Sequence, residues 1–266
     1  MTIEAQPTRL SPGDEVRARV TVGEPDGRAQ GGRVRLLYVN SYQYQSTDGD
    51  GDTTTSTAHD DVVVAEAPLF GAHGAPAAGT YEISLRVPDD APPSAEDAVE
   101  YEMVATIDRK GRRDSQVEVE LLIASAPTAY ADRAARPAEQ PDEFWAEIEA
   151  VPRELTAGAA VAGTVTVTSP AGLEGRALRV RTRGVRRDHD GLTTSYDGEP
   201  QTLAEPAALT AGGAQSHAFG VRVPADAPPT FKAEHNALEW TLEVYVDRKL
   251  RGDPVARLPL VVRSGP

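Results

Sequence analysis

The fold is decided by a stretch that occurs twice, VPDDAPPS at residues 87–94 and VPADAPPT at residues 223–230. The opening of each half repeats as well, because residues 3–22 align without gaps on residues 148–167 with ten identical positions. Blocks that recur in the same order over most of a 266-residue chain indicate two copies of one domain, and the length suits two domains. The sequence therefore predicts a tandem repeat.

The segment between the two copies differs from both. Residues 124–146 contain three prolines among alanines and polar residues, a composition typical of a linker. Residues 131–140 are the one candidate for a short helix. We expect an N-terminal domain at 1–123, a Pro/Ala-rich linker at 124–146 and a C-terminal domain at 147–266.

Apolar residues alternate with polar ones within each copy. Residues 99–107 and 238–246 each place every second, apolar side chain on one face, the pattern of a half-buried strand. A charged hairpin then leads to a closing strand, so the two strands are antiparallel. These patterns predict an all-β fold of two tandem antiparallel, immunoglobulin-like β-sandwiches, with Tyr101 and Trp240 buried at equivalent core positions.

Composition and charge exclude several classes of protein. The net charge of −14 repels nucleic acids and anionic lipid surfaces, and no apolar run is long enough for a membrane span. The chain has no cysteine, so it has no disulfide, thiolate metal site or cysteine nucleophile. Residues 1–5 do not resemble the start of a signal peptide, and we expect a cytoplasmic protein.

The duplicated pattern resembles the arrestin-like family. At residues 88–109 and 224–248 a proline is followed four positions on by Pro-Pro-Ser or Pro-Pro-Thr, then by an apolar-x-aromatic strand and an acidic-basic hairpin. The resemblance implies a non-enzymatic adaptor or scaffold that binds protein partners. The chain is similar to bacterial sporulation-control proteins, which implies a role in bacterial stress or sporulation control.

Two departures from that family are evident. Residues 1–123 contain 11 basic and 22 acidic residues, so the basic, phosphate-sensing patch of receptor arrestins is not expected there. Pro229 is followed by Thr230-Phe231, so the Pro-Pro-x-Tyr motif of related adaptors is also missing.

The strongest candidate binding surface is a run of arginines in the second copy. Six of the 14 basic residues of 147–266 lie between residues 176 and 187. Alternation along a strand places three of these arginines on one face, where guanidinium groups about 7 Å apart bind carboxylates or phosphates in bidentate fashion. The predicted partner-binding residues are Arg179, Arg181, Arg183, Arg186 and Arg187.

This arginine run has three interpretations. It is a solvated outer face with no partner, a site for an acidic or phosphorylated segment of a protein partner, or a contact to the acidic first domain of the same or a neighbouring molecule, and the neighbouring molecule would give a homo-oligomer. Salt weakens either kind of contact, because exposed charges are screened over about 8–10 Å.

No other motif carries recognisable chemistry. Asp48–Asp52 begins like a calcium loop, but Thr53 stands at the sixth position and His59 at the twelfth, where glycine and glutamate are required. We interpret the segment as a solvated loop and expect no metal, no cofactor and no catalytic residues. The chain is accordingly predicted not to be an enzyme.

The main competing class is a β-sandwich module that binds a small ligand or a carbohydrate. Tyr38, Tyr42 and Tyr44 lie even numbers of positions apart, so a strand places them on one face. Exposed tyrosines near a strand end are common in contacts to proteins and sugars. Aromatic residues make up only 5% of the chain, which disfavours a flat aromatic platform.

Overall fold

The computed structural model describes residues 1–25, 27–70, 75–125, 142–249 and 252–264. Most of the predicted linker, with the candidate helix at 131–140, lies outside these residues. The described part is an all-β protein: it has no α-helix, and η1 (His189–Gly191) is a single 3₁₀ turn. The all-β prediction is confirmed.

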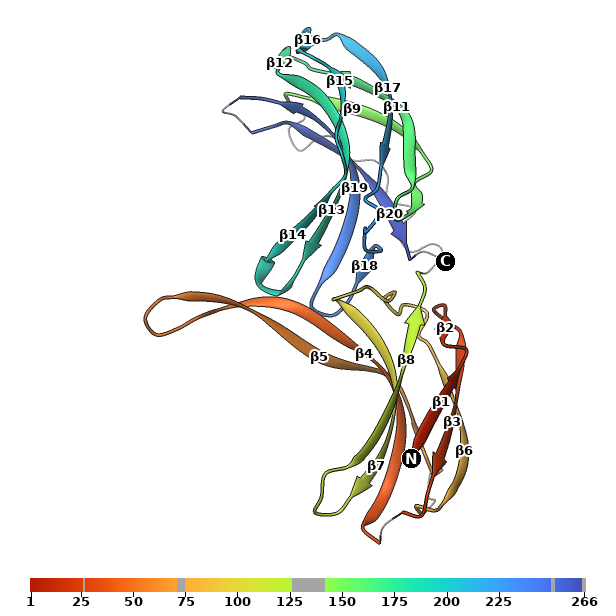
Figure 1. Cartoon of the computed structure of the whole chain (residues 1–266). Coiled ribbons are helices and arrows are strands. Elements are labelled where there is room, and N and C mark those ends of the chain that lie inside the picture. Colours follow the sequence, from red (N-terminus) through yellow and green to blue (C-terminus); the bar gives the residue numbers. More distant parts are fainter. Residues whose placement is uncertain (26, 71–74, 126–141, 250–251, 265–266) are drawn as a thin grey trace. The chain divides into compact units, whose positions relative to one another are not determined.

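The described residues form two compact units. The first consists of the described residues up to 125 together with residues 188–192, which include η1, and 231–236, which include β18 (Phe231–Lys232). Its other strands are β1 (Thr2–Gln6), β2 (Arg9–Leu10), β3 (Glu15–Val22), β4 (Ala29–Thr47), β5 (Thr53–Pro68), β6 (Gly79–Arg86), β7 (Val99–Arg109) and β8 (Ser115–Ile123). They make a three-stranded sheet in the order β1-β3-β6 and a five-stranded sheet in the order β2-β8-β7-β4-β5 (Figure 1).

The second unit repeats this arrangement. Its strands are β9 (Trp145–Val151), β10 (Glu154–Thr156), β11 (Ala160–Thr168), β12 (Leu173–Gly175), β13 (Ala177–Arg187), β14 (Thr193–Asp197), β15 (Gln201–Ala204), β16 (Ala207–Leu209), β17 (Ala214–Arg222), β19 (Ala237–Asp247) and β20 (Val255–Arg263). One sheet has the order β17-β11-β9 and the larger one has the order β10-β20-β19-β13-β14, with β15 also paired to β13. Strands β12 and β16 form a small separate pair.

Two strand pairings differ from the antiparallel prediction. β2 runs parallel to β8, and β10 runs parallel to β20. In each unit this short strand follows the first strand of one sheet and pairs with the last strand of the other sheet. At this crossing Leu10 and Leu155, at 2% and 3% exposed, bury their side chains in the core.

The duplicated stretch is explained by what it does in the core. Tyr101 and Trp240 are each only 1% exposed, so their predicted burial at equivalent positions is confirmed. The Tyr101 hydroxyl donates to the carbonyl of Pro92 at 2.9 Å, and the Trp240 Nε1 donates to the carbonyl of Pro228 at 3.0 Å. The first proline of each Pro-Pro pair therefore accepts the hydrogen bond that a buried tyrosine or tryptophan requires.

The last residue of the duplicated stretch ties each loop to the closing strand. Ser94 N donates to the Ile123 carbonyl at 2.8 Å, and Ile123 N donates back to Ser94 Oγ at 2.9 Å. Thr230 and Val262 make the same reciprocal pair at 2.7 and 2.9 Å. The hydroxyl oxygen at this position satisfies the N–H of the closing strand.

The two cores differ in the residue opposite the ring. Tyr38 lies across from Tyr101 with ring centroids 5.4 Å apart, whereas Gly184 lies across from Trp240. A Cβ atom at Gly184 would be 2.7 Å from the indole ring. The tryptophan is accommodated in the second unit because its neighbour has no side chain.

Candidate functional site

The predicted arginine run occupies β13, and its alternation is confirmed. Leu178, Val180 and Thr182 are fully buried, while Arg179, Arg181 and Arg183 lie on the opposite face with 22–34% of each side chain exposed. We call this surface the arginine face and define it by the outward side chains of β13, β14, β19 and β20, namely Arg179, Arg181, Arg183, Asp197, Glu243, Asp247 and Arg257.

Strand register brings carboxylates to these arginines. Arg181 lies directly across from Glu243 on β19, and Glu243 lies directly across from Arg257 on β20. The Arg181 guanidinium contacts Glu243 Oε2 at 2.9–3.0 Å, and Arg257 Nε donates to Oε1 at 2.8 Å. The guanidinium of Arg181 also lies 5.0 Å from the centre of the Tyr245 ring.

Glu243 is the centre of this row. Its side chain is 2% exposed, and each of its two oxygens accepts a charge-assisted hydrogen bond from a different arginine. A buried carboxylate is stable only when it is paired in this way, because removal from water is costly for an ion. Arg181 and Arg257 are therefore structural partners of Glu243.

The arginines on either side of Arg181 are held less tightly. The nearest carboxylate oxygen to the Arg183 guanidinium is Asp197 Oδ1 at 3.5 Å, and Glu243 Oε2 is 3.8 Å away. Among the described residues, this guanidinium makes one hydrogen bond, from Nη2 to Ser195 Oγ at 3.0 Å. Arg179 Nη2 contacts Asp247 at 3.6 Å, and the buried Nε of Arg179 has no hydrogen-bond partner among the described residues.

The two remaining predicted arginines lie outside this arrangement. Arg187 pairs with Glu239 at 3.0 Å, and both side chains are more than half exposed. Arg186 lies directly across from the buried Leu238 on β19. The alternation of β13 therefore places Arg186 on the face opposite to Arg179, Arg181 and Arg183. The structure brings together Arg179, Arg181 and Arg183, and leaves Arg186 and Arg187 at the strand end.

Sequence reasoning missed the acidic members of the arginine face. The alternation of residues 237–247 places Glu243 and Asp247 on the other face of the strand from Trp240. This alternation could have been used to predict that both carboxylates lie on the outer face. The register that places Glu243 beside Arg181 was not readable from the sequence.

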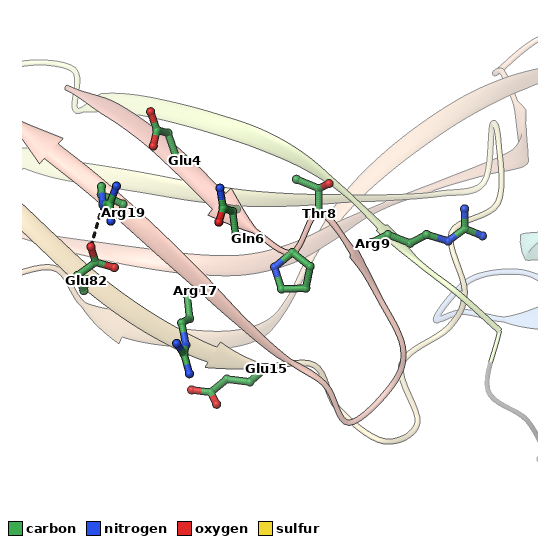
Figure 2. Close-up of a pocket in the computed structure, with 10 residues that line it drawn as sticks. Glu4, Gln6, Thr8, Arg9, Glu15, Arg17, Arg19 and Glu82 are labelled. Carbon is green, nitrogen blue, oxygen red and sulfur yellow. Dashed lines mark hydrogen bonds and ion pairs between the residues drawn. The ribbon is translucent and has the colours of Figure 1, made fainter. Parts of the chain in front are cut away.

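A second surface, also missed, is a groove of about 980 Å³ on the β1-β3-β6 sheet (Figure 2). Its lining includes three arginines and three glutamates: Arg9, Arg17, Arg19, Glu4, Glu15 and Glu82. Arg19 pairs with Glu82 at 2.8 Å, and Glu15 accepts a hydrogen bond from the Ser84 hydroxyl. The three positive and three negative side chains of this lining sum to zero net charge.

The acidic loop Asp48–Asp52 closes the β4–β5 hairpin. The Asp48 carboxylate accepts hydrogen bonds from the backbone N–H groups of Asp50 and Asp52, both at 3.0 Å. Within the described residues no group of three His, Asp or Glu side chains is arranged to hold a metal ion. Of the three tyrosines nearby, Tyr38 is buried and Tyr42 donates to Asp60 at 2.8 Å.

The described part of the chain has no helix that is long and apolar enough to cross a membrane. No protein-family model and no curated protein matches the sequence.

Proposed function

We propose that the chain is an arrestin-like adaptor, built from two immunoglobulin-like β-sandwiches, that binds protein partners and catalyses no reaction. The duplicated Pro-Pro loops support this proposal, because both copies use them to tie a buried ring and a closing strand to the same loop. The resemblance to sporulation-control proteins favours a cytoplasmic role in bacterial stress or sporulation control.

The observation that carries the proposal is the arginine face. Its central arginine, Arg181, is held by the strand register and by the buried Glu243, and Arg179 and Arg183 extend from the same strand on either side of it. Preorganised charge on an open sheet face suits a macromolecular partner, because a partner covers such a face without entering a cavity.

An affinity experiment tests this function. The tagged full chain is used to capture proteins from the cells in which it is naturally made, and each captured protein is then purified and tested for direct binding. We expect at least one protein to bind the purified chain at micromolar concentration or below. Recovery of no direct protein partner, together with tight binding on a glycan array, would support the ligand-binding module and contradict the adaptor.

A further inference from the structure

The arginine face contains two loosely paired guanidinium groups on either side of a tightly paired one. We propose that Arg179 and Arg183 bind two carboxylate side chains of an extended, acidic segment of a partner protein, while the Arg181–Glu243–Arg257 row serves as their scaffold. This inference rests on the adaptor function and names the chemistry of its partner.

The first argument comes from the distances. Charge-assisted N–H···O hydrogen bonds are about 2.7–2.9 Å long. Arg181 and Arg257 meet Glu243 within 2.8–3.0 Å, whereas Arg179 and Arg183 are 3.5–3.8 Å from their nearest carboxylate oxygens. Both outer guanidinium groups therefore retain N–H donors for which the described residues offer no hydrogen-bond partner at the usual length.

The second argument comes from spacing. Arg179 and Arg183 are four residues apart on one strand, so their Cα atoms are about 13 Å apart along it. An extended segment places the side chains of its residues i and i+4 on one face at the same spacing. Two carboxylates with this separation reach both arginines at once.

The charge of the occupant follows from the residues already on the face. Asp197 and Asp247 are monovalent, planar partners that face these arginines at long distance. A carboxylate matches the fork of a guanidinium and adds one negative charge for each arginine. A phosphate brings nearly two charges next to Asp197 and Asp247, which repel it.

A comparison of β13 with its equivalent strand β4 in the first unit gives independent support for the proposal. Arg33 on β4 is equivalent to Arg179 by register, and it holds Asp108 at 2.7 Å, within hydrogen-bond length. Leu37 is at the position equivalent to Arg183. The first unit, in which Arg33 is tightly paired, therefore has no second arginine on this strand at the position of Arg183. Two arginines that are both far from their carboxylates occur only on β13 of these two equivalent strands.

The test uses the full chain and two capped seven-residue peptides of the same composition, Thr-Glu-Thr-Thr-Thr-Glu-Thr and Thr-Thr-Glu-Glu-Thr-Thr-Thr. Binding is measured by calorimetry at low salt. We expect the peptide with glutamates four residues apart to bind at least threefold more tightly than the peptide with adjacent glutamates. We also expect its affinity to fall as salt is raised.

Variants assign the binding to the two arginines. Arg179→Gln with Arg183→Gln is expected to weaken the spaced peptide at least fivefold, while the matched control Arg187→Gln, on the same face and strand, changes it less than twofold. Asp197→Asn is expected to tighten binding, because it removes a neighbouring carboxylate that repels the peptide. Unchanged thermal melting of each variant shows that the sheet remains folded.

The inference would be overturned by equal affinity for the two peptides, by an equal loss in Arg187→Gln, or by selective binding of a phosphoserine version of the peptide. Salt-sensitive dimers that disappear in the double variant would also overturn it, since a second copy would then be the occupant. The adaptor function fails separately, through the absence of any direct protein partner. A captured partner that binds the double variant normally would contradict only the proposal for Arg179 and Arg183.

Discussion

The outer faces of the two large sheets are built on the same register and carry different charges. In the first unit β7, β8 and β5 present an acidic face, defined by Asp61, Glu100, Glu102, Glu118 and Glu120. In the second unit the arginine face extends over β14, β19 and β20, which are equivalent to β5, β7 and β8, and over β13, which is equivalent to β4. Val104 and Glu243 occupy equivalent positions, each four residues before the equivalent Asp108 and Asp247. Their cross-strand neighbours are Glu118 in the first unit and Arg257 in the second.

The difference separates what the fold needs from what is specific to each unit. An arginine faces an aspartate at equivalent positions in both copies, as the Arg33–Asp108 hydrogen bond and the longer Arg179–Asp247 contact, and the ring and loop contacts of the core also occur in both. Arg35 is equivalent to Arg181, but it faces Val104, and its Nε has no hydrogen-bond partner among the described residues. The row centred on Glu243 is therefore not required by the fold.

The largest effect is expected where the two units are alike. Tyr101→Ala and Trp240→Ala should each lower the free energy of unfolding by about 3–5 kcal/mol, because each removes a fully buried ring and leaves a cavity. Urea unfolding measures the loss, and hydrogen exchange assigns it to a unit. Leu122→Ala, at an exposed side chain, is the control. A loss below about 1 kcal/mol for either ring would contradict their equivalence.

The next effect belongs to the arginine face alone. Glu243→Gln should cost about 2–4 kcal/mol, because it leaves Arg181 and Arg257 close together without the buried carboxylate between them. Denaturant unfolding is again the measurement. Glu239→Gln, at an exposed carboxylate on the same strand, should change stability by less than about 0.5 kcal/mol. If Glu243→Gln and Glu239→Gln both changed stability by the same small amount, Glu243 would not be the centre of the row.

The comparison is sharpened by building the row in the first unit. Val104→Glu alone should destabilise it by about 1–2 kcal/mol, since it buries a carboxylate between Glu102 and Glu118. Adding Glu118→Arg should recover most of this loss, because the strands would then present an Arg-Glu-Arg row that starts at Arg35. A double-mutant cycle measures the coupling, expected at about 1–2 kcal/mol. Additive effects would show that register alone does not create the row.

The smallest effect depends on pH. Burial, followed by repulsion from Glu118, Asp61, Glu100 and Glu120, raises the pKa of Glu102 in the folded protein. A carboxyl whose pKa is higher in the folded than in the unfolded state destabilises the fold as the pH rises above its ordinary value of about 4.3. Glu102→Gln should therefore stabilise the first unit by less than about 1 kcal/mol at neutral pH, and the gain should vanish at low pH.

Urea unfolding of this variant and the original chain at several pH values provides the check. Glu96→Gln is a control for removal of one negative charge from the same unit. A gain for Glu102→Gln that is the same at all pH values would show that the ionisation of Glu102 is not its cause.

Much of this protein was determined by the sequence alone. The duplicated loop, the two-residue period of the strands and the polar and apolar parity of residues 178–183 depend only on neighbouring residues, so they were predictable. The burial of Tyr101 and Trp240 followed from the same alternation.

Only the tertiary structure decided how the arginines are used. Glu243 is 62 residues from Arg181, and the pairing that places them side by side depends on how β13 aligns with β19. A shift of one residue in that alignment would place the opposite set of side chains beside Glu243. Register is set by packing of the whole buried face, which includes Gly184 against Trp240, and no local pattern contains that information. The sheet crossings of β2 and β10 were missed for the same reason, because their partners β8 and β20 lie about a hundred residues further along the chain.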